Sequence, residues 1–142
     1  MRTRSTRLGA FGVICDGDRL LLVHQVESGR WSLPGGGVHF GEPPGIALIR
    51  EVGEEVGLQV VRAELLGVHD NVYDPGDGVQ RHGVRLLYRA HVEGMPRPCS
   101  PQEVDEARYF SIDDLPAPLT AWAAQAAYLV GKGPHGRQDA SS

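Results

Sequence analysis

Residues 36–58 of this 142-residue chain read GGVHFGEPPGIALIREVGEEVGL. Pro43 and Pro44 stand where a helix can begin, because the first turn does not need the N–H that proline lacks. Gly57 stands where such a helix can end, since glycine readily takes the left-handed cap conformation. The stretch therefore predicts a helix that begins at the two prolines and ends before Gly57.

Two sets of side chains share helical spacing within this stretch. The apolar set recurs at intervals of three and four, and that spacing predicts one buried stripe made of Ile49, Val52 and Val56. The acidic set consists of Glu51, Glu54 and Glu55. At about 100° per residue, the carboxylates gather on a helix face roughly opposite the apolar stripe.

The three neighbouring carboxylates repel one another, and this repulsion destabilises a helix. A hard divalent cation relieves the repulsion, because Mg²⁺ prefers carboxylate, phosphate and water oxygens as ligands. The alternative is an acidic face that is only solvated, as most glutamate clusters are. The glutamates therefore either hold a metal ion or form part of the solvated surface.

A glycine-rich loop, GRWSLPGGG over residues 29–37, precedes the predicted helix. Consecutive glycines let backbone amides and carbonyls approach a bound ion or phosphate, because no Cβ blocks the approach. The side chain of Trp31 can stack on a substrate or pack into the core, and we favour the core. The loop is therefore a second element of a metal or phosphate site.

Together these residues resemble the Nudix box, the signature of enzymes that hydrolyse nucleoside diphosphates linked to another moiety, X. Every defined position of the box is filled between Gly36 and Leu58, and residues 31–36 look like its usual lead-in. The resemblance implies an α/β fold, the Nudix-type α/β/α sandwich with a mixed sheet in a single domain. It also implies Mg²⁺ as the cofactor, with Mn²⁺ as a substitute.

The resemblance gives roles to the charged residues of the box. The metal ligands that it implies are Glu51, Glu54, Glu55 and the backbone carbonyl of Gly35. It implies that Arg50 pairs with a carboxylate and orients it, and that Glu42 supports the site. The alternative is an ordinary surface ion pair, worth well under ~1 kcal/mol. We expect metal-assisted attack of water at phosphorus, with Glu51, Glu54 and Arg50 among the catalytic residues.

A second acidic segment, QEVDEARYF, covers residues 102–110. Similar proteins commonly have an acidic loop before a strand that ends in an aromatic residue, and a glutamate there binds metal or acts as the base. Aligning Tyr109 with that aromatic makes Glu103 the first choice and Glu106 the second. A solvated acidic loop is the alternative. The general base is either Glu103 or one of the box glutamates.

The identity of the substrate depends on residues outside the box. In similar proteins, a proline soon after the box favours ADP-ribose and a tyrosine there favours dinucleoside polyphosphates. Tyr73 and Pro75 both occur in that region. Tyr73 can stack on a base, which is worth about 1–3 kcal/mol, or it can belong to an ordinary surface turn. The substrate is therefore expected to be ADP-ribose-like or a nucleoside triphosphate.

Arginines on a predicted strand are further candidates for substrate binding. Arg85, Arg89 or Arg81 can clamp phosphate groups, since a guanidinium fork matches phosphate geometry. Arginines on one strand face are more often simply exposed to solvent. Alternation over residues 84–92 predicts that one face of this strand is buried and that the other face presents Arg85, Leu87, Arg89 and His91.

The remaining pattern indicates mixed α/β structure. Apolar runs over residues 8–15 and 19–25 flank a turn and predict a hairpin. Strands are expected over residues 59–69 and 107–111. A last helix is expected to start at Pro118 and to stop at Gly131.

Length and composition limit the domain organisation and the location. We expect one domain over residues 8–131 and disordered tails over residues 1–7 and 132–142. Cys15 and Cys99 lack metal-ligand spacing, and no apolar stretch has the form of a signal peptide or a membrane span. A cytoplasmic, reduced protein is therefore expected.

The charge and the resemblance bear on partners. A formal net charge of −4 argues against a general binder of nucleic acids or membrane surfaces. The expected partner is a small-molecule nucleotide. The resemblance is also compatible with a homodimer, because similar proteins commonly form dimers. A non-catalytic sensor of a nucleotide derivative is the alternative function. Such a module would usually have lost box carboxylates, which this chain keeps.

Overall fold

A computed structural model describes residues 3–132. Its elements are, in chain order, β1 (Thr3–Val13), β2 (Cys15–Asp16), β3 (Arg19–Gln25), β4 (Trp31–Ser32), β5 (Gly35–Gly37), α1 (Pro44–Val56), β6 (Gln59–Tyr73), β7 (Val79–Glu93), β8 (Val104–Ser111) and α2 (Ala121–Lys132). None of the helices in this range is long and apolar enough to cross a membrane.

Within residues 3–132, the strands form two four-stranded sheets. The first has the order β5-β1-β7-β6, in which β1 runs parallel to β7 and the other neighbours are antiparallel. The second joins β2, β3 and β4, with β8 paired to β3. The first sheet is therefore mixed, as the resemblance implies. The predicted hairpin forms as β2 and β3, whereas residues 8–13 belong to β1 in the other sheet.

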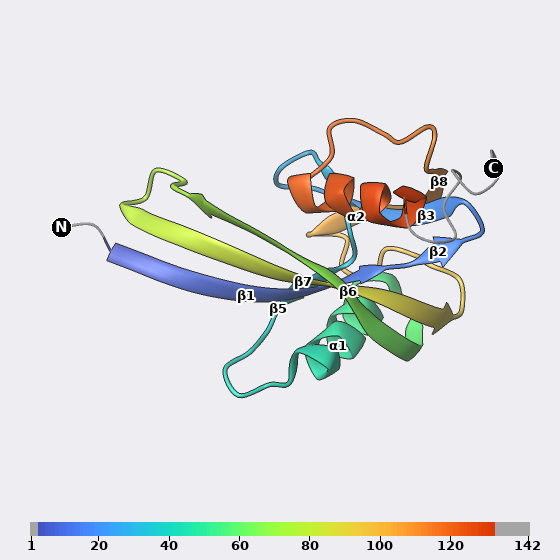
Figure 1. Cartoon of the computed structure of the whole chain (residues 1–142), viewed down its shortest axis with the longest axis horizontal. Helices are drawn as coiled ribbons and strands as arrows, with labels where there is room; N and C mark the ends of the chain where they lie inside the picture. Colours follow the sequence, from blue (N-terminus) through green and yellow to red (C-terminus); the bar gives the residue numbers. More distant parts are fainter. Residues whose placement is uncertain (1–2, 133–142) are drawn as a thin grey trace.

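The two helices cover opposite sides of the strands (Figure 1). One cluster of buried side chains joins α1 to β1, β3 and β7, and the other joins α2 to β1, β3 and β7. This is the expected α/β/α arrangement. The ends of β1, β6 and β7 project beyond both helices as a long arm (Figure 1).

Helix α1 begins and ends where the sequence predicts. Pro44 is its first residue, and Gly57 follows it in the left-handed conformation with φ of 71°. The residues that it buries are Ala47, Leu48, Val52 and Val56. The prediction that Ile49 belongs to the buried stripe is wrong, because Ile49 is 47% exposed. Leu48, one residue earlier, continues the interval of four from Val52 and takes that place.

Strand β7 is covered on both faces, so the prediction of one buried and one exposed face is wrong. Arg85 is only 9% exposed and Leu87 is fully buried. Leu87 belongs to the cluster under α2, which covers the face expected to be open. The alternation of apolar residues indicated the strand, but it did not show that α2 covers the second face of that strand.

The ends of the domain differ from the expected boundaries. Strand β1 begins at Thr3, so the prediction of a disordered tail is wrong for residues 3–7, which pair with β7. Residues 133–142 of the other predicted tail lie outside the described residues. Helix α2 begins at Ala121 instead of Pro118, and the hydroxyl of Thr120 accepts a hydrogen bond from the N–H of Ala123. Thr120 thus caps the first turn.

Candidate active site

Arg50 is the centre of the charged site on α1. Its Nε and Nη2 atoms donate to both carboxylate oxygens of Glu42, each at 2.9 Å. Its Nη1 atom donates to Glu51 at 2.9 Å and to Glu54 at 3.0 Å. Nη2 also donates to the carbonyl of Gly37. One guanidinium group therefore holds three glutamates of the stretch and ties them to β5, which is more than a single surface ion pair.

The bond to Glu42 has a clear electrostatic effect. Hydrogen bonds from Arg50 and from the N–H of His39 lower the pKa of Glu42 to about 2. Glu42 therefore stays ionised at neutral pH and keeps Arg50 oriented toward Glu51 and Glu54.

Glu51 lies against a glycine that leaves room for its carboxylate. A Cβ on Gly36 would come within 2.6 Å of both Cδ and Oε2 of Glu51. Any side chain at this position would displace the carboxylate, because contacts below about 3 Å do not occur without movement. Gly36 therefore belongs to the site because the absence of a side chain there leaves space for the Glu51 carboxylate.

Glu55 lies deeper than the other glutamates of α1. Its Oε1 atom accepts a hydrogen bond from the N–H of Gly35 at 3.1 Å. The pKa of Glu55 is raised to about 7, chiefly by burial and to a smaller extent by the nearby charges of Glu51 and Glu103, while the hydrogen bond from Gly35 acts in the opposite direction. A carboxylate in this position is ionised at low cost only when a cation neutralises it.

The segment before β8 brings Glu103 to the same end of α1. The N–H of Cys99 donates to the carbonyl of Glu55 at 2.9 Å, and the hydroxyl of Ser100 donates to the carbonyl of Glu54. The carbonyl of Ser100 in turn accepts from the N–H of Glu103 at 2.9 Å. Glu103 is thereby connected to the last turn of α1 through Ser100.

These residues have the donor chemistry of a site for a hard divalent cation. Glu51, Glu54, Glu55 and Glu103 supply carboxylate oxygens, and β5 supplies backbone carbonyls beside them. As the side chains stand, no three histidine, cysteine, aspartate or glutamate side chains within residues 3–132 converge on one metal position. Two of the carboxylates are held by Arg50 instead. The residues fit a metal by their chemistry and by the unneutralised charge around Glu55.

The family of the chain follows from comparison with known proteins. The family model of the NUDIX domain matches residues 5–130. The chain belongs to the Nudix family. A crystal structure of a MutT NUDIX hydrolase from Burkholderia pseudomallei has a TM-score of 0.80 and 38% sequence identity, and the match covers 89% of this chain and 98% of that one. The fold and the family expected from the sequence are confirmed.

The names of two curated relatives give different substrates. A Mycobacterium tuberculosis protein provisionally named 8-oxo-dGTP diphosphatase 2 is 40% identical over 89 residues, covering 58% of this chain and 59% of that protein. The NAD-capped RNA hydrolase NudC of Pseudomonas putida is 30% identical over 120 residues, covering 83% of this chain and 41% of that protein. The match to each spans less than two thirds of that relative's length. Both names describe hydrolases.

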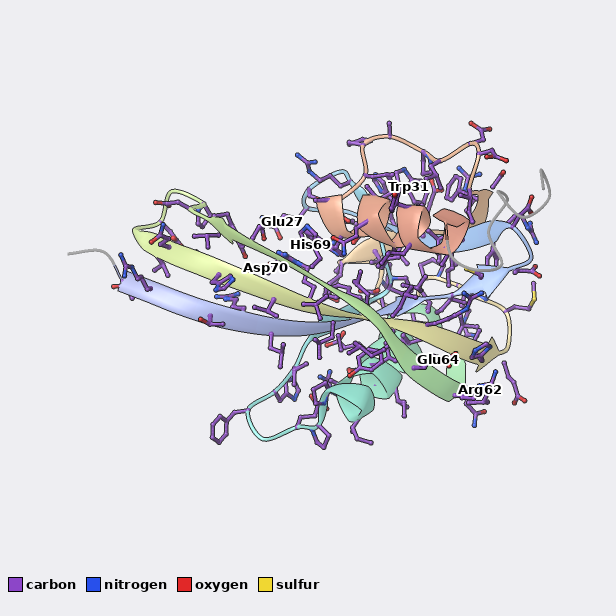
Figure 2. The ribbon with its side chains drawn as sticks, viewed as in Figure 1. Glu27, Trp31, Arg62, Glu64, His69 and Asp70 are labelled. Atoms are coloured by element: carbon purple, nitrogen blue, oxygen red, sulfur yellow. The ribbon has the colours of Figure 1, made fainter. Side chains whose placement is uncertain are left out.

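The other residues singled out in the sequence lie at several places. Tyr73 and Arg85 line a cavity of about 200 Å³ that also borders Gly36 and Gly37 of the Nudix box. Arg89 is not among the residues that line it. Trp31 is only 8% exposed and packs under α2, as favoured from the sequence (Figure 2). The alternative glutamate, Glu106, is exposed and lies near Arg108.

Two residues at this cavity escaped the sequence-based prediction. Arg7 lines it, although the chain before residue 8 was expected to be a tail. Gly83 lines it as well. Neither residue belongs to a motif. Gly83 lies two residues before Arg85 on β7, and the pairing of β1 with β7 places Arg7 beside Gly83.

A larger cavity, of about 640 Å³, lies elsewhere between the ends of β2, β7 and β8. Its lining includes Cys15, Arg19 and Tyr109 but none of the Nudix box residues. Tyr109 is at the far end of β8 from Glu103, which stands just before that strand. Size alone therefore does not identify the reacting site.

Proposed function

We propose that this Nudix protein hydrolyses a diphosphate bond in a nucleoside diphosphate linked to X, in a reaction that depends on Mg²⁺. The observation that carries the proposal is the partly buried carboxylate of Glu55, which lies against the N–H of Gly35 and near the charges of Glu51 and Glu103. Such a concentration of negative charge requires a cation before an anionic diphosphate can approach.

The proposed metal ligands are Glu51, Glu54, Glu55, Glu103 and the backbone carbonyl of Gly35. Bound Mg²⁺, or Mn²⁺ in its place, supplies Lewis-acid stabilisation of charge on the phosphate oxygens, which is worth several kcal/mol. Arg50 holds Glu51 and Glu54 at fixed distances from Gly37 and so keeps two of these ligands in place.

The reaction is a displacement at phosphorus. The oxygen of water forms a bond to one phosphorus atom, and the bridging oxygen leaves with its electron pair. The proton of the water passes to a carboxylate, either Glu103 or a box glutamate, which acts as the general base. Glu103 is suited to this role because its backbone is connected to the end of α1 through Ser100.

On the substrate side, we propose that Tyr73 and Arg85 contact the nucleotide, since both line the cavity beside Gly36 and Gly37. Arg89 lies on the same strand as Arg85 and stays a candidate for binding the substrate. It is a weaker one, because it does not line that cavity. The names of the relatives include a triphosphate substrate and an NAD-capped RNA substrate, so they support more than one form of X. An ADP-ribose-like compound and a nucleoside triphosphate are both consistent with the reaction.

The test compares Glu54→Gln with Glu64→Gln on a nucleoside triphosphate and on ADP-ribose, with and without Mg²⁺. Glu64 is an exposed glutamate on β6, at 3.3 Å from His91, and serves as the matched control (Figure 2). We expect Glu54→Gln to lower turnover by about a hundredfold or more, because a charged metal ligand is lost. Retention of near wild-type turnover would contradict a mechanism centred on the Nudix box.

The same panel tests the alternative function. Tight binding of a nucleotide without turnover of any substrate would favour a sensor. The products then identify the substrate class, because a triphosphate gives a monophosphate and pyrophosphate, whereas ADP-ribose gives AMP and ribose 5-phosphate. The cytoplasmic location and the homodimer remain predictions, which fractionation of cells and light scattering can test.

A further inference from the structure

Two arginines from distant parts of the chain meet on one face of the first sheet. In the parallel pairing of β1 with β7, Arg7 is the partner of Gly83 and Gly9 is the partner of Arg85. Each arginine thus lies beside a glycine on the neighbouring strand. The side chain of Phe11 packs over Gly9 and that of Arg85 packs over Gly83, and both arginines line the cavity at this face.

The position of Arg85 is fixed by its contacts. Its guanidinium carbon lies 3.9 Å from the centre of the Trp122 ring, and its Nη1 atom donates to Asn71 at 2.8 Å. The same Nη1 atom lies 3.4 Å from Nδ1 of His69, whose pKa is lowered by burial and by Arg85 itself. His69 therefore contributes no positive charge near pH 7.

The other end of the Arg85 guanidinium is free for a ligand. A Cβ on Gly83 would lie 2.7 Å from its Nη2 atom, so Nη2 stands directly over Gly83, the register partner of Arg7. Within residues 3–132, only Nε1 of Trp122 is a fully buried side-chain polar atom without a hydrogen bond. Nη2 makes no hydrogen bond within that range and is therefore accessible from the cavity.

No carboxylate among the described residues neutralises this pair. Neither Arg7 nor Arg85 forms an ion pair within residues 3–132, whereas Arg81 on the same strand is bound to Asp77 at 2.8 Å. Asp70 acts on Arg85 only from a distance and is hydrogen-bonded to His82 at 2.8 Å. The lining of the cavity contains both arginines and no acidic residue. In a chain with a net charge of −4, this is a local positive site.

The cavity adjoins the reacting site and is small. Gly36 lines it and is also the residue that touches Glu51 on the carboxylate side. Its volume of about 200 Å³ is below the range of roughly 300–1,000 Å³ that is usual for a whole ligand. It therefore accommodates one part of a substrate whose diphosphate lies at the carboxylates.

We propose that Arg7 and Arg85 bind a phosphate group of the substrate that lies beyond the hydrolysed bond and its two phosphates. This inference rests on the proposed function and narrows it. ADP-ribose carries only the two phosphates that flank the broken bond, and both ends of the molecule are uncharged. A nucleoside triphosphate carries a third, and paired guanidinium groups match its geometry. The substrate class is therefore a nucleoside triphosphate, cleaved to the monophosphate and pyrophosphate.

The test measures kcat/KM of Arg7→Gln on dGTP and on ADP-ribose with saturating Mg²⁺. Arg4→Gln is the matched control, because Arg4 is also exposed on β1 but lines a different cavity. We expect Arg7→Gln to lower kcat/KM for dGTP by about tenfold or more, since charge-assisted hydrogen bonds are lost. Activity on ADP-ribose should change by less than about twofold, as should both activities of Arg4→Gln.

A second variant displaces the Arg85 guanidinium without removing its charge. A methyl group in Gly83→Ala would lie 2.7 Å from Nη2, 3.1 Å from Cζ and 3.2 Å from Nη1, so the end of this flexible side chain has to move. It should reduce activity on dGTP selectively while the melting temperature stays close to that of the wild type. Equal losses on both substrates in Arg7→Gln and Gly83→Ala, no loss in either variant, or a wild type that cleaves only ADP-ribose would overturn the inference.

Binding separates this inference from the proposed function. Calorimetry with the α,β-imido analogue of dGTP and Mg²⁺ reports affinity without hydrolysis. If the wild type cleaves neither substrate, the proposed function fails. A loss of analogue affinity of about tenfold in Arg7→Gln but not in Arg4→Gln would then still support the phosphate subsite. Equal affinities of the two variants would overturn it.

Discussion

The two charged regions beside Gly36 are built in opposite ways. The acidic region consists of the glutamates around Arg50 and lies within one helix and its flanking loop. The basic region consists of Arg7 and Arg85, which reach the same cavity only because β1 pairs with β7. In the acidic region one arginine binds three glutamates and leaves a net negative charge, whereas the basic region has no ion-pair partner within the described residues. A local spacing specifies the first, and strand register specifies the second.

Replacing Arg50 should break the acidic region most severely. Lysine keeps the charge but cannot reproduce the fork that reaches Glu42, Glu51 and Glu54 together. We expect Arg50→Lys to lower kcat by about a hundredfold, because metal ligands shift by about 1 Å. Arg19→Lys, in the exposed pair with Asp16, is the control and should leave kcat unchanged. Similar kcat values for the two variants would show that Arg50 is only a surface residue.

Glu55 predicts how stability depends on pH in the absence of metal. Its pKa is raised to about 7 in the folded protein from an ordinary 4.5, so the folded state binds the proton more tightly. Its contribution to stability is therefore present below pH 4.5 and is lost as pH rises toward 7. We expect the free energy of unfolding in EDTA to fall by about 2 kcal/mol more between pH 5 and pH 8 than it does in Glu55→Gln.

The measurement for Glu55 is denaturant unfolding at both pH values, with and without Mg²⁺. Added Mg²⁺ should stabilise the wild type more at pH 8 than at pH 5, because it favours the ionised carboxylate. A wild type and a Glu55→Gln variant with parallel pH profiles in EDTA would contradict the predicted burial of this charge.

Substitution of Gly36, which lies between the acidic and the basic region, tests whether the position of the Glu51 carboxylate matters for catalysis. Alanine at this position would meet the Glu51 carboxylate at 2.6 Å and displace it without changing any charge. We expect Gly36→Ala to lower kcat by about tenfold, a smaller effect than loss of the Arg50 fork. Gly45→Ala is the control, since a Cβ there meets nothing within 4 Å. Unchanged turnover in Gly36→Ala would place the Glu51 carboxylate away from the reaction.

Substitution of Gly53 should have the smallest effect, and it tests whether the stability of α1 depends on local helix propensity. A Cβ at this position would meet only the carbonyl of Leu58, at 3.9 Å, so alanine fits. We expect Gly53→Ala to raise the free energy of unfolding by about 1 kcal/mol, the usual difference between these residues inside a helix. Thermal and urea unfolding measure it, and a lower stability would show that the glycine is needed for its backbone.

The sequence predicted best what depends on neighbours in the chain. Pro44 and Gly57 mark the ends of α1 because capping depends on local backbone chemistry. The error at Ile49 arose because a three-and-four pattern fits more than one stripe, and only packing against the sheet selects Leu48. Arg7 was missed because its role depends on pairing with a strand far along the chain.

The parallel pairing of β1 with β7 also has a consequence for the order of folding. It joins residues from Thr3 onward to residues from Val79 onward, and such distant contacts form slowly, because a long loop must first close. Helix α1 depends on short-range contacts and can form early. The carboxylates of α1 can therefore come together through local structure, whereas the two arginines are brought together only when β7 docks against β1.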